Sequence, residues 1–284
     1  MKIIRFFIII SIILYFFASC QKRAAFHTNQ SLEHYKDIME FFANIEENNV
    51  NEIIHQYIIN HLKKSDAIIE EYQFADETTS ITATNVVCRF YPQHSRRVII
   101  ISPYSPVGIN NTAYFEAETK RIAYSIGLML ETASMLSSQI PNQYGVDLVF
   151  GGTIPDLYPT RSCSQAFRNL IANYGKVKPE LGIFLWLHPS EKMSVPIDDH
   201  SYQKLPYIVH RIWTTAEDLG WREFEKSLEA SSLFEGEELL YRELNTIKLK
   251  NRYEEDKEVL PEHLTSNFRI LGSLFKELIY GKDR

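Results

Sequence analysis

The 284-residue sequence predicts an α/β protein whose single domain has a central mixed, mostly parallel sheet flanked by helices. Two observations predict this class. Long segments carry apolar residues at helical spacing, and short apolar runs between them favour strands that are buried on both faces. The clearest run is Val98, Ile99, Ile100 and Ile101. Because neither a repeat nor a linker divides the body of the chain, we expect one domain over residues 31–284.

The predicted elements alternate between helices and strands along this domain. Two amphipathic helices come first, at residues 32–42 and 53–62. The predicted strands are residues 67–74, 85–90, 97–102, 146–150, 181–187 and 245–249. The later helices are residues 112–138, 164–174, 205–219 and 261–280, the last with proline in its first turn. Residues 222–244 give no firm pattern, so the sequence leaves open whether they fill a cleft.

The composition is that of an ordinary globular protein, with 45% hydrophobic and 23% charged residues. It excludes disordered and collagen-like chains. Lys and Arg total 30 against 36 Asp and Glu, giving a net charge of −6. Because no basic stretch is present to neutralise a phosphate backbone, we expect no nucleic-acid partner.

The first 20 residues have the layout of an export signal. Lys2 and Arg5 precede an apolar run over residues 6–17, which ends in Ser19 and Cys20. Small residues before a cysteine resemble the bacterial lipobox, which implies a signal peptide over 1–19, lipidation of Cys20 and a tether to residue 30. Gln21 is similar to the residue that sends such lipoproteins to the outer membrane, so we expect that location in the bacterial cell envelope. An uncleaved membrane anchor is the alternative, but a run of about 16 residues is short for a span.

Two further cysteines leave their own chemistry open. Cys88 and Cys163 would lie in an oxidising compartment, where they either form a disulfide or stay as two buried thiols. Neither has the flanking residues of a cysteine nucleophile. The sequence also lacks a G-x-S-x-G elbow, a phosphate-binding loop and an H-E-x-x-H zinc motif.

Several ordered segments resemble the exported zinc aminopeptidases and glutaminyl-peptide cyclotransferases. RRVIIISPYS at 96–105 is similar to the family's RRVVLAAHYDS, and GVDLVF at 145–150 to GVDLVFFDGEE. IVHRIWTTAEDLGW at 208–221 resembles IVDKVWKTAAELGY of the cyclase branch. The resemblance runs from about Asn51 to Tyr280. It implies the family's phosphorylase/hydrolase-like α/β fold.

The zinc ligands that this resemblance implies are missing. A catalytic zinc site needs three or four His or carboxylate ligands with a further carboxylate as acid or base. The family's ligand and carboxylate positions fall on Pro103, Ser105, Arg121, Gly152, Thr153, Ile154, Pro155, Trp186 and Asn251. We therefore expect no catalytic residue, no metal and no cofactor.

The sequence thus predicts a lipid-anchored pseudoenzyme that binds a peptide or another envelope protein. Its remnant cleft would contain Ser102, Tyr104, Arg121, Asp156, Trp186 and Asn251. Arg121 would pair with a carboxylate and Trp186 would stack on an apolar group, unless Arg121 is a surface residue and Trp186 a core residue.

Two other interpretations remain. An active zinc enzyme would use displaced ligands, from Asp156 and from Asp198, Asp199 and His200. A structural subunit of an envelope complex would keep the fold without using the cleft. The remaining histidines are expected at the surface or half-buried, namely His55, His61 and His94, with His188 in a strand-end turn.

Overall fold

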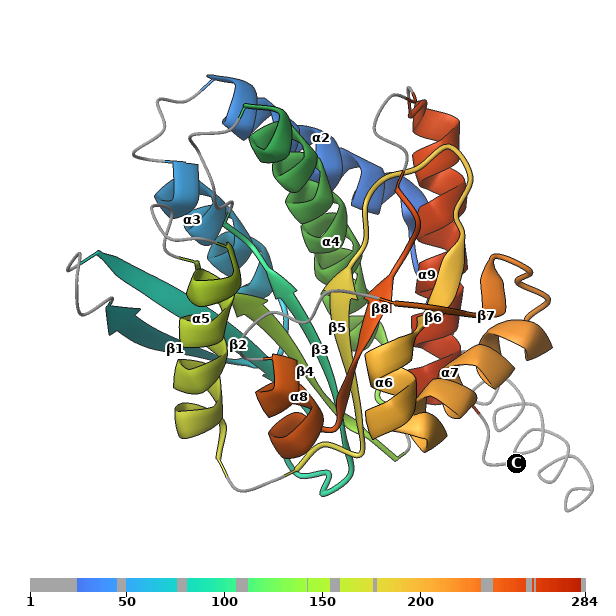
Figure 1. Ribbon diagram of the computed structural model, residues 1–284. Coiled ribbons are helices and arrows are strands. Elements are labelled where there is room, and N and C mark those ends of the chain that lie inside the picture. The colour runs from blue at the N-terminus through green and yellow to red at the C-terminus, as the bar shows by residue number, and fades with distance from the viewer. Residues whose placement is uncertain are drawn as a thin grey trace, which may run out of the picture.

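The chain folds around a six-stranded sheet in the order β1-β2-β4-β3-β5-β8 (Figure 1). The computed structural model describes residues 25–44, 50–75, 81–105, 112–141, 143–153, 159–175, 178–230, 237–253, 257 and 259–281. Strands β3, β4, β5 and β8 are parallel, whereas β2 is antiparallel to β4 and to β1. This confirms the mixed, mostly parallel sheet. The strands are β1 (Ile68–Ala75), β2 (Thr82–Phe90), β3 (Arg97–Pro103), β4 (Gly145–Gly151), β5 (Leu181–Trp186) and β8 (Thr246–Lys250).

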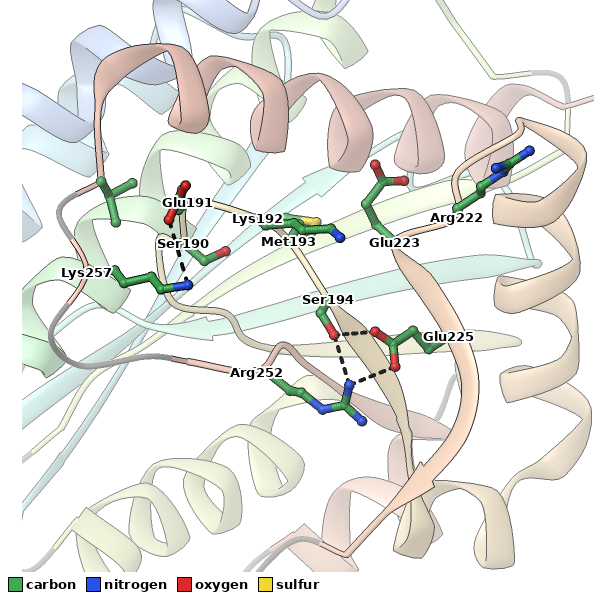
Figure 2. Close-up of a pocket in the computed structure, with 11 residues that line it drawn as sticks. Ser190, Glu191, Lys192, Met193, Ser194, Arg222, Glu223, Glu225, Arg252 and Lys257 are labelled. Carbon is green, nitrogen blue, oxygen red and sulfur yellow. Dashed lines mark hydrogen bonds and ion pairs between the residues drawn. The ribbon is translucent and has the colours of Figure 1, made fainter.

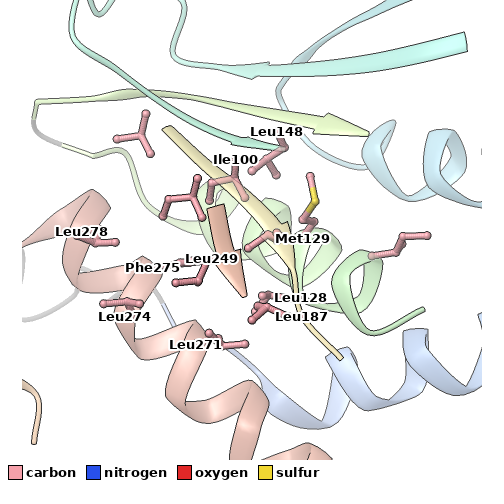
Figure 3. Packing of buried hydrophobic residues seen from close by; sticks show 14 of the residues in the cluster. Ile100, Leu128, Met129, Leu148, Leu187, Leu249, Leu271, Leu274, Phe275 and Leu278 are labelled. Atoms are coloured by element: carbon pink, nitrogen blue, oxygen red, sulfur yellow. The ribbon is translucent and has the colours of Figure 1, made fainter. Parts of the chain in front are cut away.

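Helices cover both faces of this sheet. One face packs against α2 (Thr28–Asn44), α3 (Val50–Leu62), α4 (Thr112–Ser138), α7 (Pro206–Asp218) and α9 (Pro261–Tyr280). The other face packs against α5 (Pro159–Tyr174) and α8 (Glu237–Leu244). Figure 3 shows the larger core, where leucines of α9 meet Leu187 and Leu249 at the sheet and Leu128 of α4. Burial on both sides explains the continuous apolar runs of the central strands.

Four short elements were not predicted. Strands β6 (Val195–Asp198) and β7 (Phe224–Glu229) form a separate two-stranded parallel sheet, and α6 (Asp199–Lys204) follows β6 directly. Helix α8 lies in the region where the sequence gave no firm pattern. Strand β6 has only four residues, and β7 is mostly polar without a clear alternation of buried and exposed positions, so neither shows a strand signal that differs from that of a loop.

A buried ion pair joins β3 to β4 inside this apolar frame. Asp147 of β4 is fully buried, and it accepts hydrogen bonds from Arg97 of β3 at 2.6 and 2.5 Å. Tyr174 at the end of α5 also donates to Asp147. Since a buried carboxylate needs such partners, Arg97 and Tyr174 explain how GVDLVF accommodates an aspartate.

Ordered structure begins before residue 31. Helix α2 starts at Thr28, and the ring of Phe26 packs against Gly272 of α9 at a spot that a side chain at 272 would fill. The backbone N–H of His27 donates to Glu131 of α4 at 2.8 Å. The predicted signal peptide and Cys20 lie outside the described residues. None of the helices described here is long and apolar enough to cross a bilayer.

Cys88 and Cys163 are not joined by a disulfide in this structure, and both are buried. Cys88 belongs to the core on one face of the sheet and Cys163 to the core on the other. Of the two interpretations that the sequence left open, the structure therefore has the pair of buried thiols.

Candidate functional site

The carboxyl ends of parallel strands are where open α/β sheets place their ligands. Four predicted cleft residues come from this edge: Ser102 and Tyr104 at the end of β3, Trp186 at the end of β5 and Asn251 directly after β8. Arg121 reaches the same edge from α4. The sixth predicted residue, Asp156, lies outside the described residues.

Arg121 is a buried cation, with 1% of its side chain exposed, so it is not a surface residue of its helix. Its Nε and Nη2 atoms donate to the two carboxylate oxygens of Glu118 at 2.9 and 2.6 Å. Glu118 lies three residues earlier in α4, on the same face of the helix, and is equally buried. Glu118 therefore supplies, from within the chain, the carboxylate that the sequence led us to expect from a ligand.

Trp186 covers this ion pair. The guanidinium carbon of Arg121 lies 3.8 Å from the centroid of the Trp186 ring, within range of a cation–π contact. On β8, the ammonium nitrogen of the buried Lys248 lies 5.8 Å from the same centroid. Trp186 also packs on the α5 side of the core, and it remains half-buried. Two basic side chains therefore surround the indole at the strand ends.

Asn251 holds the loop that follows β5. Its Oδ1 accepts from the backbone N–H of His188 at 2.8 Å, and its Nδ2 donates to the His188 carbonyl at 2.9 Å. The same Nδ2 lies 3.3 Å from the Ser190 hydroxyl, and Asn267 of α9 donates to the Ser190 carbonyl at 2.7 Å. Because Asn251 is 1% exposed and fully engaged in this way, its position fixes the loop backbone.

The pKa of His188 is affected by the positive charges at this edge of the sheet. Burial, together with the charges of Arg121 and Lys250, lowers its pKa to about 3. The ring stacks on Tyr253 with centroids 4.4 Å apart. His188 is thus a neutral, packed side chain in the loop after β5, where the structure has no turn of the kind predicted at this residue.

Ser102 and Tyr104 bond to the backbone of the sheet and of the residues at its edge. The Ser102 hydroxyl donates to the Pro103 carbonyl at 3.1 Å, and the Tyr104 hydroxyl donates to the Thr84 carbonyl at 3.0 Å. Burial raises the pKa of Tyr104 well above its ordinary value. Sequence reasoning missed the contact with His55, whose Nδ1 lies 3.4 Å from the Tyr104 hydroxyl and whose Nε2 lies 2.9 Å from Glu71.

The side chains at this edge do not fit the zinc ion that the family resemblance implies. Across the described ranges, no group of three or more His, Cys, Asp or Glu side chains is arranged to hold a metal ion. Glu118, the buried carboxylate nearest Arg121 in α4, is occupied, because both of its oxygens accept hydrogen bonds from Arg121. Asp198, considered above as a displaced ligand, caps α6 by accepting from the backbone N–H of Ser201 at 2.8 Å.

This architecture is the fold of glutaminyl cyclases and zinc-dependent exopeptidases. It superimposes on the glutaminyl cyclase of Bacteroides thetaiotaomicron bound to N-acetylhistamine with a TM-score of 0.76 and 16% identity, covering 91% of this chain and 99% of that one. A leucine aminopeptidase precursor from the same organism superimposes with a TM-score of 0.75 and 15% identity, covering 92% of this chain and 99% of that one. The glutaminyl cyclase of Tannerella forsythia superimposes with a TM-score of 0.70 and 19% identity, covering 91% of this chain and 100% of that one. No protein-family model and no curated protein sequence matches the chain.

A cavity of about 350 Å³ opens beside the loop that Asn251 holds (Figure 2). Its walls are residues 190–194, the start of β7 and the segment after β8. Arg252 is tied down here, since it donates to Glu225 at 2.8 Å and approaches the Ser194 hydroxyl at 3.3 Å. Lys192 and Glu223 also border the cavity and are at least partly exposed. The lining therefore offers both signs of charge.

Proposed function

We propose that this protein is a non-catalytic, lipid-anchored member of the glutaminyl cyclase and exopeptidase fold that binds a peptide or another protein of the cell envelope. One observation carries the proposal: a buried Arg121–Glu118 ion pair beneath Trp186 stands at the strand ends. Because Arg121 engages both carboxylate oxygens of Glu118, this buried carboxylate is not available to ligate a metal ion. The fold is kept although the chemistry that its relatives perform there is unsupported.

The proposed partner site is the cavity of residues 190–194. Ser190 connects this cavity to the end of β8, because it lines the cavity and accepts a hydrogen bond from Asn251. The loop is held by buried asparagines on both sides, so the site is preorganised, which lowers the entropic cost of binding. Lys192 and Glu223 supply opposite charges for the ends or side chains of a peptide.

The proposed location rests on the N-terminal sequence. The apolar run, the small residues before Cys20 and Gln21 after it support a lipid anchor and the outer membrane. Metabolic labelling with a clickable fatty acid tests this step. Label on the wild-type chain that is lost in Cys20→Ala is expected, and equal labelling of both would contradict it.

Metal content and turnover test the absence of catalysis. Zinc is quantified per chain after dialysis and again after zinc loading, alongside assays for glutaminyl cyclisation and aminopeptidase activity. We expect no stoichiometric zinc and no turnover. One zinc per chain with turnover would favour the alternative of an active enzyme, and loss of both in His200→Gln would then identify a displaced ligand.

Charge reversal tests the partner site. Lys192→Glu and Glu223→Lys change an exposed and a partly exposed side chain at the cavity, whereas Lys204→Glu changes an exposed lysine of α6 outside it. After crosslinking in intact cells, we expect a partner band that the cavity variants lose and the control keeps. A band that is insensitive to both cavity variants would favour the structural-subunit interpretation.

A further inference from the structure

A second cavity, of about 370 Å³, lies where α2, the end of α3 and the later part of α4 meet. Glu131 of α4 lines it, ten residues and therefore about 15 Å along the helix from Arg121. The size falls within the usual range of small-molecule sites. Its polar walls include Glu33, His34, His61, Lys64 and Ser134.

Glu131 is a buried carboxyl group with unused hydrogen-bonding capacity. The residue is 0% exposed, and its Oε1 accepts from the backbone N–H of His27. Within the described part of the chain, its Oε2 accepts no hydrogen bond. A buried carboxylate oxygen without a donor is costly, which marks it as a group that a ligand could satisfy.

The two histidines of the cavity are acceptors as well. Tyr57 donates its hydroxyl proton to Asp37 at 2.8 Å, so its oxygen must accept from Nδ1 of His34, 2.7 Å away. His61 likewise donates from Nδ1 to the Tyr57 carbonyl at 2.9 Å. In the neutral form of either ring, this geometry selects the tautomer that carries its lone pair on Nε2. Burial lowers the pKa of His34 to about 4, so this ring stays neutral near pH 7.

The two exposed charges at the rim of the cavity are opposite, so the buried carboxylate of Glu131 sets the charge that a ligand must have. Glu33 and Lys64 are both exposed and carry opposite charges. Glu131, His34 and His61 then present three acceptors, a pattern that suits a ligand rich in N–H donors and positively charged. We propose that this cavity binds a small organic amine in its protonated form, with its ammonium group on Glu131.

Calorimetric titration of the full-length chain in detergent with putrescine tests this proposal, with 1,4-butanediol as the uncharged ligand of equal length. At pH 8 and 150 mM salt, we expect saturable binding of one putrescine per chain and at least tenfold weaker binding of the diol. Equal binding of the two ligands, or no saturation by putrescine, would overturn the proposal.

Two variants locate the binding. Glu131→Gln keeps an oxygen for His27 but removes the charge, and we expect at least tenfold weaker binding. Ser134→Trp changes an exposed position of α4 that lines the cavity, so it should block the cavity without disturbing the core and weaken binding as much. Glu238→Gln changes an exposed side chain of α8 and should bind as the wild type does. Unchanged affinity in either cavity variant would place the amine elsewhere and refute the site.

Discussion

Replacing Glu118 by alanine would leave the Arg121 guanidinium in the interior without its carboxylate. Both side chains are at most 3% exposed, and two hydrogen bonds of 2.6 and 2.9 Å join them. Removing one partner of a buried ion pair costs about 3–5 kcal/mol. At about 2–4 °C per kcal/mol for a domain of this size, the melting temperature should fall by roughly 6–20 °C.

Denaturant unfolding followed by tryptophan fluorescence measures this loss, because Trp186 covers the pair. Glu116→Ala is the matched control, since Glu116 lies on the same helix with 66% of its side chain exposed and pairs only with Lys120 in the described chain. Its cost should stay within about 1 kcal/mol. The double variant Glu118→Leu with Arg121→Met removes both charges and should regain most of the stability.

The reasoning fails if Glu118→Ala costs no more than Glu116→Ala. It fails equally if the double variant is as unstable as Glu118→Ala, because the charge left unpaired would then not be the cause.

Three further predictions concern other parts of the fold. Asn251→Ala should cost about 2–4 kcal/mol in denaturant unfolding, because two buried backbone groups of the loop after β5 lose their partner; a smaller loss than about 1 kcal/mol would mean that the loop is not held there. Burial raises the pKa of Glu131 from 4.5 to about 7, so the folded state binds the carboxyl proton more tightly than the unfolded state does. The contribution of Glu131 to the free energy of unfolding should therefore fall as the pH rises from about 4.5 to about 7. Denaturant unfolding of Glu131→Gln at a series of pH values should lack that decline, and parallel profiles of the unfolding free energy in wild type and variant would contradict the raised pKa of Glu131. Cys88 and Cys163 should react with a thiol reagent only after unfolding, since both are buried and burial raises the pKa of Cys88 to about 12; rapid reaction of the folded chain would show otherwise.

Elements with a strong local signal were predictable from the sequence. Helices α4 and α9 begin and end where the pattern placed them, at Thr112–Ser138 and Pro261–Tyr280. Strand β3 ends only one residue later than predicted. It was predictable because a continuous apolar run is typical of a strand that is buried on both faces. Elements of four to eight residues with mixed polarity, such as β6 and α8, carry too little periodicity to be found.

One contact of the candidate site was predictable from the sequence, and its chemistry was less so. Comparison with the family placed Arg121 and Trp186 in one cleft, and the structure brings them into contact. The partner of Arg121 was missed, although Glu118 lies at helical spacing three residues before it. Helical spacing predicts which side chains can contact each other. The burial that makes the ion pair important for stability depends on packing between distant segments, which the sequence does not reveal. The contact between His55 and Tyr104 was missed for the same reason.

The docking of Phe26 against Gly272 limits how far the protein can stand from a bilayer. Only five peptide units separate Cys20 from Ala25, the first described residue, and an extended chain spans about 3.3–3.6 Å per residue. If Cys20 carries the proposed lipid, the linker between the membrane and the domain is therefore at most about 18 Å long. The domain would then stay close to the membrane surface, and it could meet only molecules that come within that distance of the bilayer.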